Sequence, residues 1–249
     1  MTTAERARLG RLVRWIDGAL VKACGEPEPY PPGDPLDGLI ATILSQNTND
    51  TNSGRAYDAM RETYPTWEEV MSAPPRQLEK VLRPGGLART KTARIQHILR
   101  SIADGGTLSL DSLAKMTNEE AEAYLLRFDG VGYKTARCVL MFELGRDVFP
   151  IDTHIHRVLM RVGVIPQRMN VDRAHQHLPG LIEKGRCYPL HINLIRHGRR
   201  LCHPKNPKCS ACPLRRRCAF YFVEGSLSKT GATSGPLKPS DRRKKLTAD

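Results

Sequence analysis

The sequence contains no run of about 18 uncharged apolar residues, the length that a helix needs to cross a membrane. Its first residues, Met1 to Arg14, lack the apolar stretch of a secretory signal. We therefore expect no membrane association and a cytoplasmic protein, associated with the nucleoid if it is bacterial. The sequence also lacks any convincing alternation of apolar and polar residues, the pattern of a half-buried strand, and it has no internal repeat at a fixed period.

Acidic residues are few in comparison with basic ones. The chain has 26 Asp and Glu against 39 Lys and Arg, a formal net charge of +13 and a pI near 9.7. This balance points to a polyanionic partner, with nucleic acid as the first candidate, more than to an acidic metabolite. With 40% hydrophobic residues in 249, the chain is neither disordered nor fibrous and can bury one or two cores.

Apolar residues recur at helical spacing through most of the chain, which predicts an all-α fold. Asp34 followed by Pro35, and Thr117 with Glu120, carry the signatures of helix N-termini. The expected helices span about 3–23, 34–45, 51–63, 67–71, 75–82, 90–103, 117–128, 133–144, 152–162, 171–177 and 189–197. Residues 223–249 are rich in Ser, Thr, Gly, Pro and Lys, which predicts a disordered basic tail.

Four of the seven cysteines lie within 17 residues of one another, separated by six, two and five residues: Cys202, Cys209, Cys212 and Cys218. Four soft ligands so close together suit zinc or an iron–sulfur cluster. Zinc ribbons usually pair two Cys-x-x-Cys knuckles and this segment has only one, so the spacing favours iron–sulfur. The three scattered cysteines, Cys24, Cys138 and Cys187, are expected in the core.

Basic residues lie among the four clustered cysteines. Lys205 and Lys208 stand where a rigid cluster loop could hold them against phosphates. They could equally be solubilising charges.

A short turn, Gly130-Val131-Gly132, joins two expected helices. Its glycines allow a tight turn that brings backbone N–H groups near a ligand, and the following helix adds its positive end, so a phosphate fits there. Lys134 lies in the first turn of that helix. Taken alone, however, the turn could be an ordinary helix connection, Lys134 a phosphate contact, and Asp152 simply the N-cap of the helix that starts at Thr153.

Three segments together are much more specific than any one of them: Phe128 to Ala136, Ile151 to Arg157, and His197-Gly198-Arg199 leading into the four cysteines. In their order and separation they resemble the DNA glycosylases of the helix-hairpin-helix superfamily, in particular the endonuclease III group. The resemblance covers roughly Asp34 to Phe222.

The resemblance implies two helical domains with a DNA-binding groove between them. A six-helix barrel with the helix-hairpin-helix motif would span residues 28–146, and an iron–sulfur cluster domain would combine 1–27 with 147–222. The four clustered cysteines would hold a 4Fe-4S cluster.

The resemblance also implies a bifunctional DNA glycosylase and abasic-site lyase, with Lys134 as nucleophile and Asp152 as catalytic carboxylate. A lysine amine can attack C1′ of a deoxyribose, expel the base and hold the sugar as a Schiff base, and β-elimination then cuts the strand on the 3′ side. Burial and the positive end of a helix both favour the neutral amine. Asp152 could stabilise positive charge on the sugar. The expected partner is double-stranded DNA with a damaged pyrimidine or an abasic site, bound by a monomer.

Such an enzyme must fill the gap left by the extruded nucleotide. The resemblance assigns this role to Gln46 or Asn47 and to an apolar wedge, Leu87 in Gly86-Leu87-Ala88. Members of the group read Leu-Ser-Ala-Gln where this chain has Leu44-Ser45-Gln46-Asn47, so the glutamine stands one place early. A plain hydrophobic anchor of its loop is the alternative role for Leu87.

Three other functions remain open at this stage. A monofunctional glycosylase for thymine or uracil opposite guanine would excise without cutting, and a non-catalytic DNA-binding module would use only the hairpin. An electron-transfer iron–sulfur protein would explain the cysteines but not the hairpin. Lys134 favours the bifunctional enzyme, because related adenine-removing glycosylases lack a lysine there.

Overall fold

The computed structural model describes residues 1–223, so the predicted tail lies outside the described residues except for Val223. Within residues 1–223 the chain is helical and has no strand, which confirms the all-α prediction. Among the helices of residues 1–223, none is both long and apolar enough to cross a bilayer. The α-helices are α1 (Thr3–Cys24), α2 (Pro35–Ser45), α3 (Asp50–Thr63), α4 (Trp67–Ser72), α5 (Pro75–Leu82), α6 (Ala88–Ala103), α7 (Asn118–Leu125), α8 (Tyr133–Cys138), α9 (Thr153–Val162), α10 (Val171–His177) and α11 (Cys187–Arg200).

Helix starts follow the predicted capping signals closely. Asp34 accepts hydrogen bonds from the N–H groups of Leu36 and Asp37 at 2.7 and 2.9 Å, and Thr117 forms the expected capping box with Glu120. The ends are less regular. The helix predicted over 133–144 is an α-helix only to Cys138 and continues as a π-helix, η3 (Val139–Glu143). The described chain also contains the short 3-10 helices η1 (Arg83–Gly85), η2 (Asp111–Lys115), η4 (Cys209–Ala211) and η5 (Arg215–Arg217).

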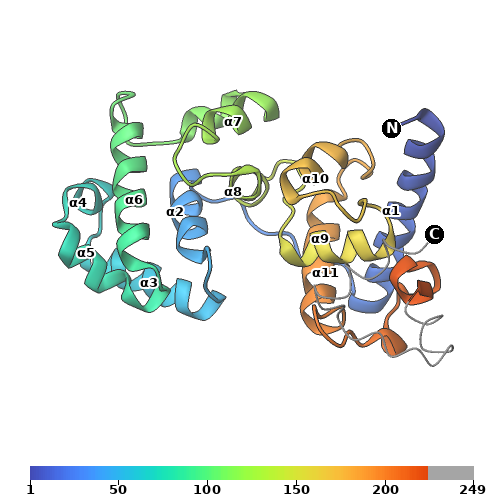
Figure 1. The fold of residues 1–249 in the computed structure, drawn as a ribbon. Coiled ribbons are helices and arrows are strands. Elements are labelled where there is room, and N and C mark those ends of the chain that lie inside the picture. The colour runs from blue at the N-terminus through green and yellow to red at the C-terminus, as the bar shows by residue number, and fades with distance from the viewer. Residues whose placement is uncertain (224–249) are drawn as a thin grey trace, which may run out of the picture.

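The buried apolar side chains form two separate cores. The first runs from Leu36 to Leu140 and is built by α2 to α8, and the second joins α1 to the chain from Phe149 onward. Figure 1 shows the two lobes side by side, with the N-terminal α1 packed among the C-terminal helices. The exact domain boundaries given above stay predictions.

Two polar connections tie distant parts of the chain together. Arg186 at the start of α11 pairs with Asp17 of α1 at 2.6 Å, within the second lobe. Arg137 of α8 pairs with Glu122 of α7 and donates to the carbonyl oxygen of His175 in α10 at 3.0 Å, so it links the two lobes.

Candidate active site

Lys134 is the second residue of α8 and is half-buried at the boundary of the two lobes. The preceding turn depends on Gly130, which has a φ of 76° and lies so close to the Arg94 guanidinium that a Cβ there would overlap it. Val131 turns its side chain into the first core and donates its N–H to Phe128 O at 3.0 Å. Of the three predicted turn residues, Gly132 is therefore the exposed one, Gly130 is half-buried and Val131 is buried.

Asp152 is the N-cap of α9, as one of the two roles considered for it predicted. Its Oδ1 accepts a hydrogen bond from the Ile155 N–H at 2.7 Å, and its Oδ2 has no hydrogen-bond partner among residues 1–223. Capping fixes the direction of the carboxylate without consuming its second oxygen.

Lys134 and Asp152 both lie close to the same two buried groups. The charges of both act on two buried groups between the lobes, the thiol of Cys138 and the imidazole of His191. Burial raises the pKa of the Cys138 thiol and lowers the pKa of His191 to about 4. His191 is therefore neutral near pH 7, and its Nδ1 donates to Pro150 O at 2.9 Å. The Lys134 amine and the Asp152 carboxylate thus both lie near a buried, neutral imidazole and a buried thiol.

An ion pair that the sequence analysis missed lies near Lys134 and Asp152. Arg199 of α11 pairs with Asp50 of α3 at 2.7 Å, and both side chains are exposed. The hydrogen bond from Arg199 lowers the pKa of Asp50, with smaller contributions from Lys134 and His154. Arg199 belongs to the quoted motif His197-Gly198-Arg199, but Asp50 lies 149 residues earlier in the chain, so sequence spacing gave no sign of the contact.

The structure distinguishes the two polar candidates for filling the gap in the duplex. The side chain of Gln46 forms its hydrogen bonds within the protein. Its Nε2 donates to Gly130 O at 3.1 Å and to Thr135 Oγ1 at 3.3 Å, and its Oε1 accepts from Arg94 Nη1 at 2.9 Å. Asn47 is exposed at a turn with a φ of 54°. Asn47 is therefore the residue whose side chain is available to DNA.

Leu87 stands 57% exposed with a left-handed φ of 49°, so the alternative in which it anchors its loop in the core is wrong. The buried Lys91 of α6 holds this loop beside the Asn47 turn, because its Nζ donates to Gly85 O at 2.8 Å and to Leu44 O at 2.6 Å. The exposed side chains of Leu87 and Asn47 therefore stand on two segments that Lys91 holds together.

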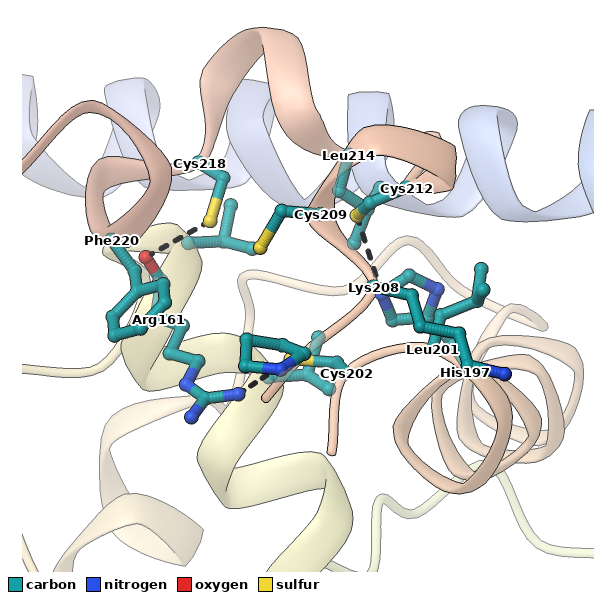
Figure 2. A pocket seen from close by; sticks show the side chains of 13 residues that line it. Arg161, His197, Leu201, Cys202, Lys208, Cys209, Cys212, Leu214, Cys218 and Phe220 are labelled. Carbon is teal, nitrogen blue, oxygen red and sulfur yellow. Dashed lines mark hydrogen bonds between the residues drawn. The ribbon is translucent and has the colours of Figure 1, made fainter. Parts of the chain in front are cut away.

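The four clustered cysteines, Cys202, Cys209, Cys212 and Cys218, line a single cavity, and Figure 2 shows their sulfur atoms gathered around it. Arg161 Nη1 donates to the Cys202 sulfur at 3.2 Å, and His197 Nε2 lies 3.6 Å from the Cys212 sulfur. Burial raises the pKa of Cys212 to about 11 and also raises that of Cys218. Thiols held in this way become thiolates when a cationic group binds them.

Four cysteine sulfurs around one cavity are a donor set that suits an iron–sulfur cluster or a zinc ion. Among residues 1–223, no three His, Cys, Asp or Glu side chains are gathered closely enough to hold one metal ion. A zinc ion would draw all four sulfurs to about 2.3 Å from itself. Four cysteines spread around one cavity suit the larger iron–sulfur core.

The remaining residues singled out from the sequence differ in their exposure to solvent. Lys205 and Lys208 are exposed on the cysteine loop, where they can reach a polyanion. Cys138 and Cys187 are buried as expected, but Cys24 is exposed because α1 turns it away from the second core, so that prediction is wrong.

The chain is similar in sequence to several known proteins. Residues 40–184 match the family described as HhH-GPD superfamily base excision DNA repair protein. The endonuclease III of Thermotoga maritima is 34% identical over 194 residues, which cover 77% of this chain and 86% of the relative. A candidate DNA glycosylase of Arabidopsis thaliana is 37% identical over 165 residues, which cover 66% of this chain but only 56% of the relative. The chain thus spans about half of the Arabidopsis protein.

Two solved structures are similar over nearly the whole chain. A non-covalent endonuclease III–DNA complex has a TM-score of 0.74 at 25% identity, covering 91% of this chain and all of that one. A trapped covalent intermediate of endonuclease III with DNA has a TM-score of 0.73 at 25% identity, covering 90% of this chain and all of that one.

Proposed function

Since this chain belongs to the HhH-GPD superfamily of base excision DNA repair proteins and is an endonuclease III-like DNA glycosylase, we propose that it is bifunctional, removing a damaged base and then cutting the strand. The observation that carries this proposal is the placement of Lys134 and Asp152, whose charges reach the same buried Cys138 and His191 from opposite lobes. The trapped covalent complex of the similar endonuclease III supports a nucleophile of this kind.

In the proposed reaction the neutral amine of Lys134 attacks C1′ of the extruded nucleotide. The bond from C1′ to the base breaks, and the base leaves with the electron pair and takes up a proton. Asp152 stabilises positive charge on the sugar and assists removal of a proton from the attacking nitrogen. Opening of the sugar ring leaves a Schiff base between Nζ and C1′.

The Schiff base makes the C2′ proton acidic. Loss of that proton expels the 3′ phosphate by β-elimination, which breaks the strand, and water then hydrolyses the Schiff base and returns the free lysine. No second enzyme is needed for strand cleavage in this scheme.

The damaged pyrimidine of the proposed substrate is extruded while Leu87 and Asn47 fill the gap. Leu87 would wedge into the base stack, and Asn47 would contact the opposite base. An oxidised pyrimidine is the substrate class proposed here, as the resemblance to the endonuclease III group implies.

The four cysteines of the lined cavity would hold a 4Fe-4S cluster. When bound, such a cluster ties its loop to α9 and α11 and so fixes Lys205 and Lys208 in position for DNA phosphates. Iron and sulfide in equal amounts in the purified protein, lost in Cys212→Ser, would support this assignment, and zinc in their place would contradict it.

Borohydride trapping tests the bifunctional assignment. The duplex carries one thymine glycol or one abasic site, and wild type is compared with Lys134→Ala. We expect a covalent protein–DNA adduct from the wild type and none from the variant, because only a lysine Schiff base is reduced to a stable amine. Lys134→Ala must still bind the duplex, which serves as the control.

The absence of an adduct from wild-type protein that binds and excises would replace the proposal with a monofunctional glycosylase. A duplex with thymine or uracil opposite guanine, tested in parallel, identifies that outcome.

A further inference from the structure

His175 of α10 is a fully buried histidine whose two ring nitrogens are both in use. Its Nδ1 lies 2.9 Å from Val171 O, and its Nε2 lies 2.9 Å from the Ile151 nitrogen. A carbonyl oxygen can only accept and a backbone N–H can only donate. The ring therefore carries its proton on Nδ1 and a lone pair on Nε2, in one fixed neutral tautomer.

This one side chain contacts the neighbours of both proposed catalytic residues. Nε2 accepts from the N–H of Ile151, the residue directly before Asp152. The ring stacks on Tyr133, the residue directly before Lys134, with centroids 5.8 Å apart and planes at 26°. Arg137 strengthens the junction by donating to His175 O at 3.0 Å. His175 thus lies between the two segments that deliver the amine and the carboxylate.

The contact with Ile151 matters because of where that N–H lies. Ile151 is fully buried in the extended segment before α9, outside any helical ladder that could satisfy its N–H. A buried N–H without a partner is costly, so the lone pair of His175 fixes the backbone at this point. The direction of the Asp152 carboxylate depends on that backbone, since its capping bond forms three residues further along.

The charges around His175 keep it neutral. The groups that face it are Arg137 of α8, Glu122 of α7 and Asp172 of α10 itself. Burial, and then the charge of Arg137, lower the pKa of His175 to about 4. The lone pair on Nε2 is therefore present at every pH near 7. The hydrogen bond from the Ile151 N–H to His175 does not depend on pH in that range.

We propose that His175 is a positioning residue, which holds Asp152 in register with Lys134 through Ile151 on one side and Tyr133 on the other. The proposal rests on the roles proposed above for Lys134 and Asp152. Nothing in it requires His175 to touch DNA.

Two substitutions separate the two contacts. His175→Phe keeps a ring for Tyr133 but removes the acceptor for Ile151, whereas His175→Gln offers an amide oxygen to Ile151 and loses the stack. His177→Phe is the matched control, because His177 lies on the same helix and its Nε2 has no hydrogen-bond partner among the described residues.

The measurements are the single-turnover rate of base release with enzyme in excess, scored after alkali cleavage, and the Kd for a duplex with an uncleavable abasic analogue. We expect His175→Phe to release base about 100-fold more slowly at unchanged Kd, since a shift of about 1 Å in catalytic geometry costs on that order. His175→Gln should recover part of the rate, and His177→Phe should match the wild type.

A wild-type rate for His175→Phe would overturn the proposal, and so would equal losses in rate and DNA binding, which would indicate a purely structural role. If His175→Phe does not fold, Tyr133→Leu removes the stack at a half-buried position and must lower the rate at unchanged Kd. Alkali scoring detects base release with or without lyase activity, so a failure of the Schiff base in the trapping experiment is distinguishable from a failure of this proposal.

Discussion

At the scale of single residues, the candidate site depends on which polar atoms already form hydrogen bonds within the protein and which do not. Asp152 caps α9 with Oδ1, and its Oδ2 has no hydrogen-bond partner among residues 1–223. Both polar atoms of the Gln46 side chain form hydrogen bonds within the protein, whereas the side chain of Asn47 is exposed and available to DNA. Whether a side chain is available to DNA therefore depends on whether its donors and acceptors already have partners in the protein.

The double role of Asp152 is separable by substitution. Asp152→Asn keeps a good N-cap and removes the charge, so the free energy of unfolding should stay close to that of the wild type while base release slows by about 100-fold. Asp152→Ala should lose the same activity and in addition about 1 kcal/mol of stability. Urea unfolding and single-turnover excision measure the two effects. An active Asp152→Asn would contradict a catalytic role for the carboxylate.

The buried histidines make the stability of the protein depend on pH. The pKa values of His175 and His191 are lowered to about 4, so the unfolded chain binds more protons than the native one between about pH 6.5 and about pH 4. Stability should be fully present above this window and fall with acidification, by at most about 1.4 kcal/mol per pH unit for each histidine. Urea unfolding across the window checks this, and His175→Phe should flatten the slope.

At the scale of elements, α6 is the support for the parts expected to meet DNA. Lys91 and Arg94 lie one turn apart on it and reach Leu44, Gly85 and Gln46. Through Gln46 the same helix contacts Gly130 in the turn before α8. The loop of Leu87, the turn of Asn47 and the hairpin before Lys134 are thus all connected to one helix.

This arrangement predicts different effects for two adjacent substitutions. Asn47→Ala should leave stability unchanged and weaken discrimination between bases opposite the lesion, because only its exposed side chain is lost. Gln46→Ala should lower the free energy of unfolding by about 1 to 3 kcal/mol, because it leaves buried partners unsatisfied. Thermal unfolding and excision from duplexes with each opposite base measure these effects. If Gln46→Ala weakened discrimination between opposite bases and Asn47→Ala lowered stability, Gln46 rather than Asn47 would be the residue that contacts the opposite base.

At the scale of the whole molecule, two lobes with separate cores place the amine on one side and the carboxylate on the other. The Arg199–Asp50 and Arg137–His175 contacts span the junction. The excess of positive charge favours a polyanion over the whole surface, and the lobes define where on it the chemistry occurs.

The charge excess has a measurable consequence for DNA binding. Affinity should fall steeply between about 50 and about 200 mM salt, because bound phosphates release counterions. Lys205→Ala and Lys208→Ala should each reduce the slope of log K against log salt by about 1 if each lysine contacts a phosphate. Lys184→Ala, a lysine in the loop before α11, is the comparison variant. An unchanged slope in both loop variants would make these lysines solubilising charges.

The sequence by itself determined the helices, their N-caps and the identity of the chemical groups. Helical spacing and caps such as Asp34 and Thr117 act over a few residues, so the local sequence specifies them. The motifs around Lys134, Asp152 and the clustered cysteines are also local. The roles of those residues stay proposals that the experiments above test.

Only the tertiary structure decided which of these groups meet and which are already in use. The Asp50–Arg199 pair, the internal bonding of Gln46, the exposure of Leu87 and Cys24, and the position of His175 all depend on segments far apart in the chain. A hydrogen bond consumes a lone pair or a proton wherever its partner comes from, and burial depends on all the elements that pack around a residue. Sequence spacing carries neither kind of information, because both arise when the two cores assemble.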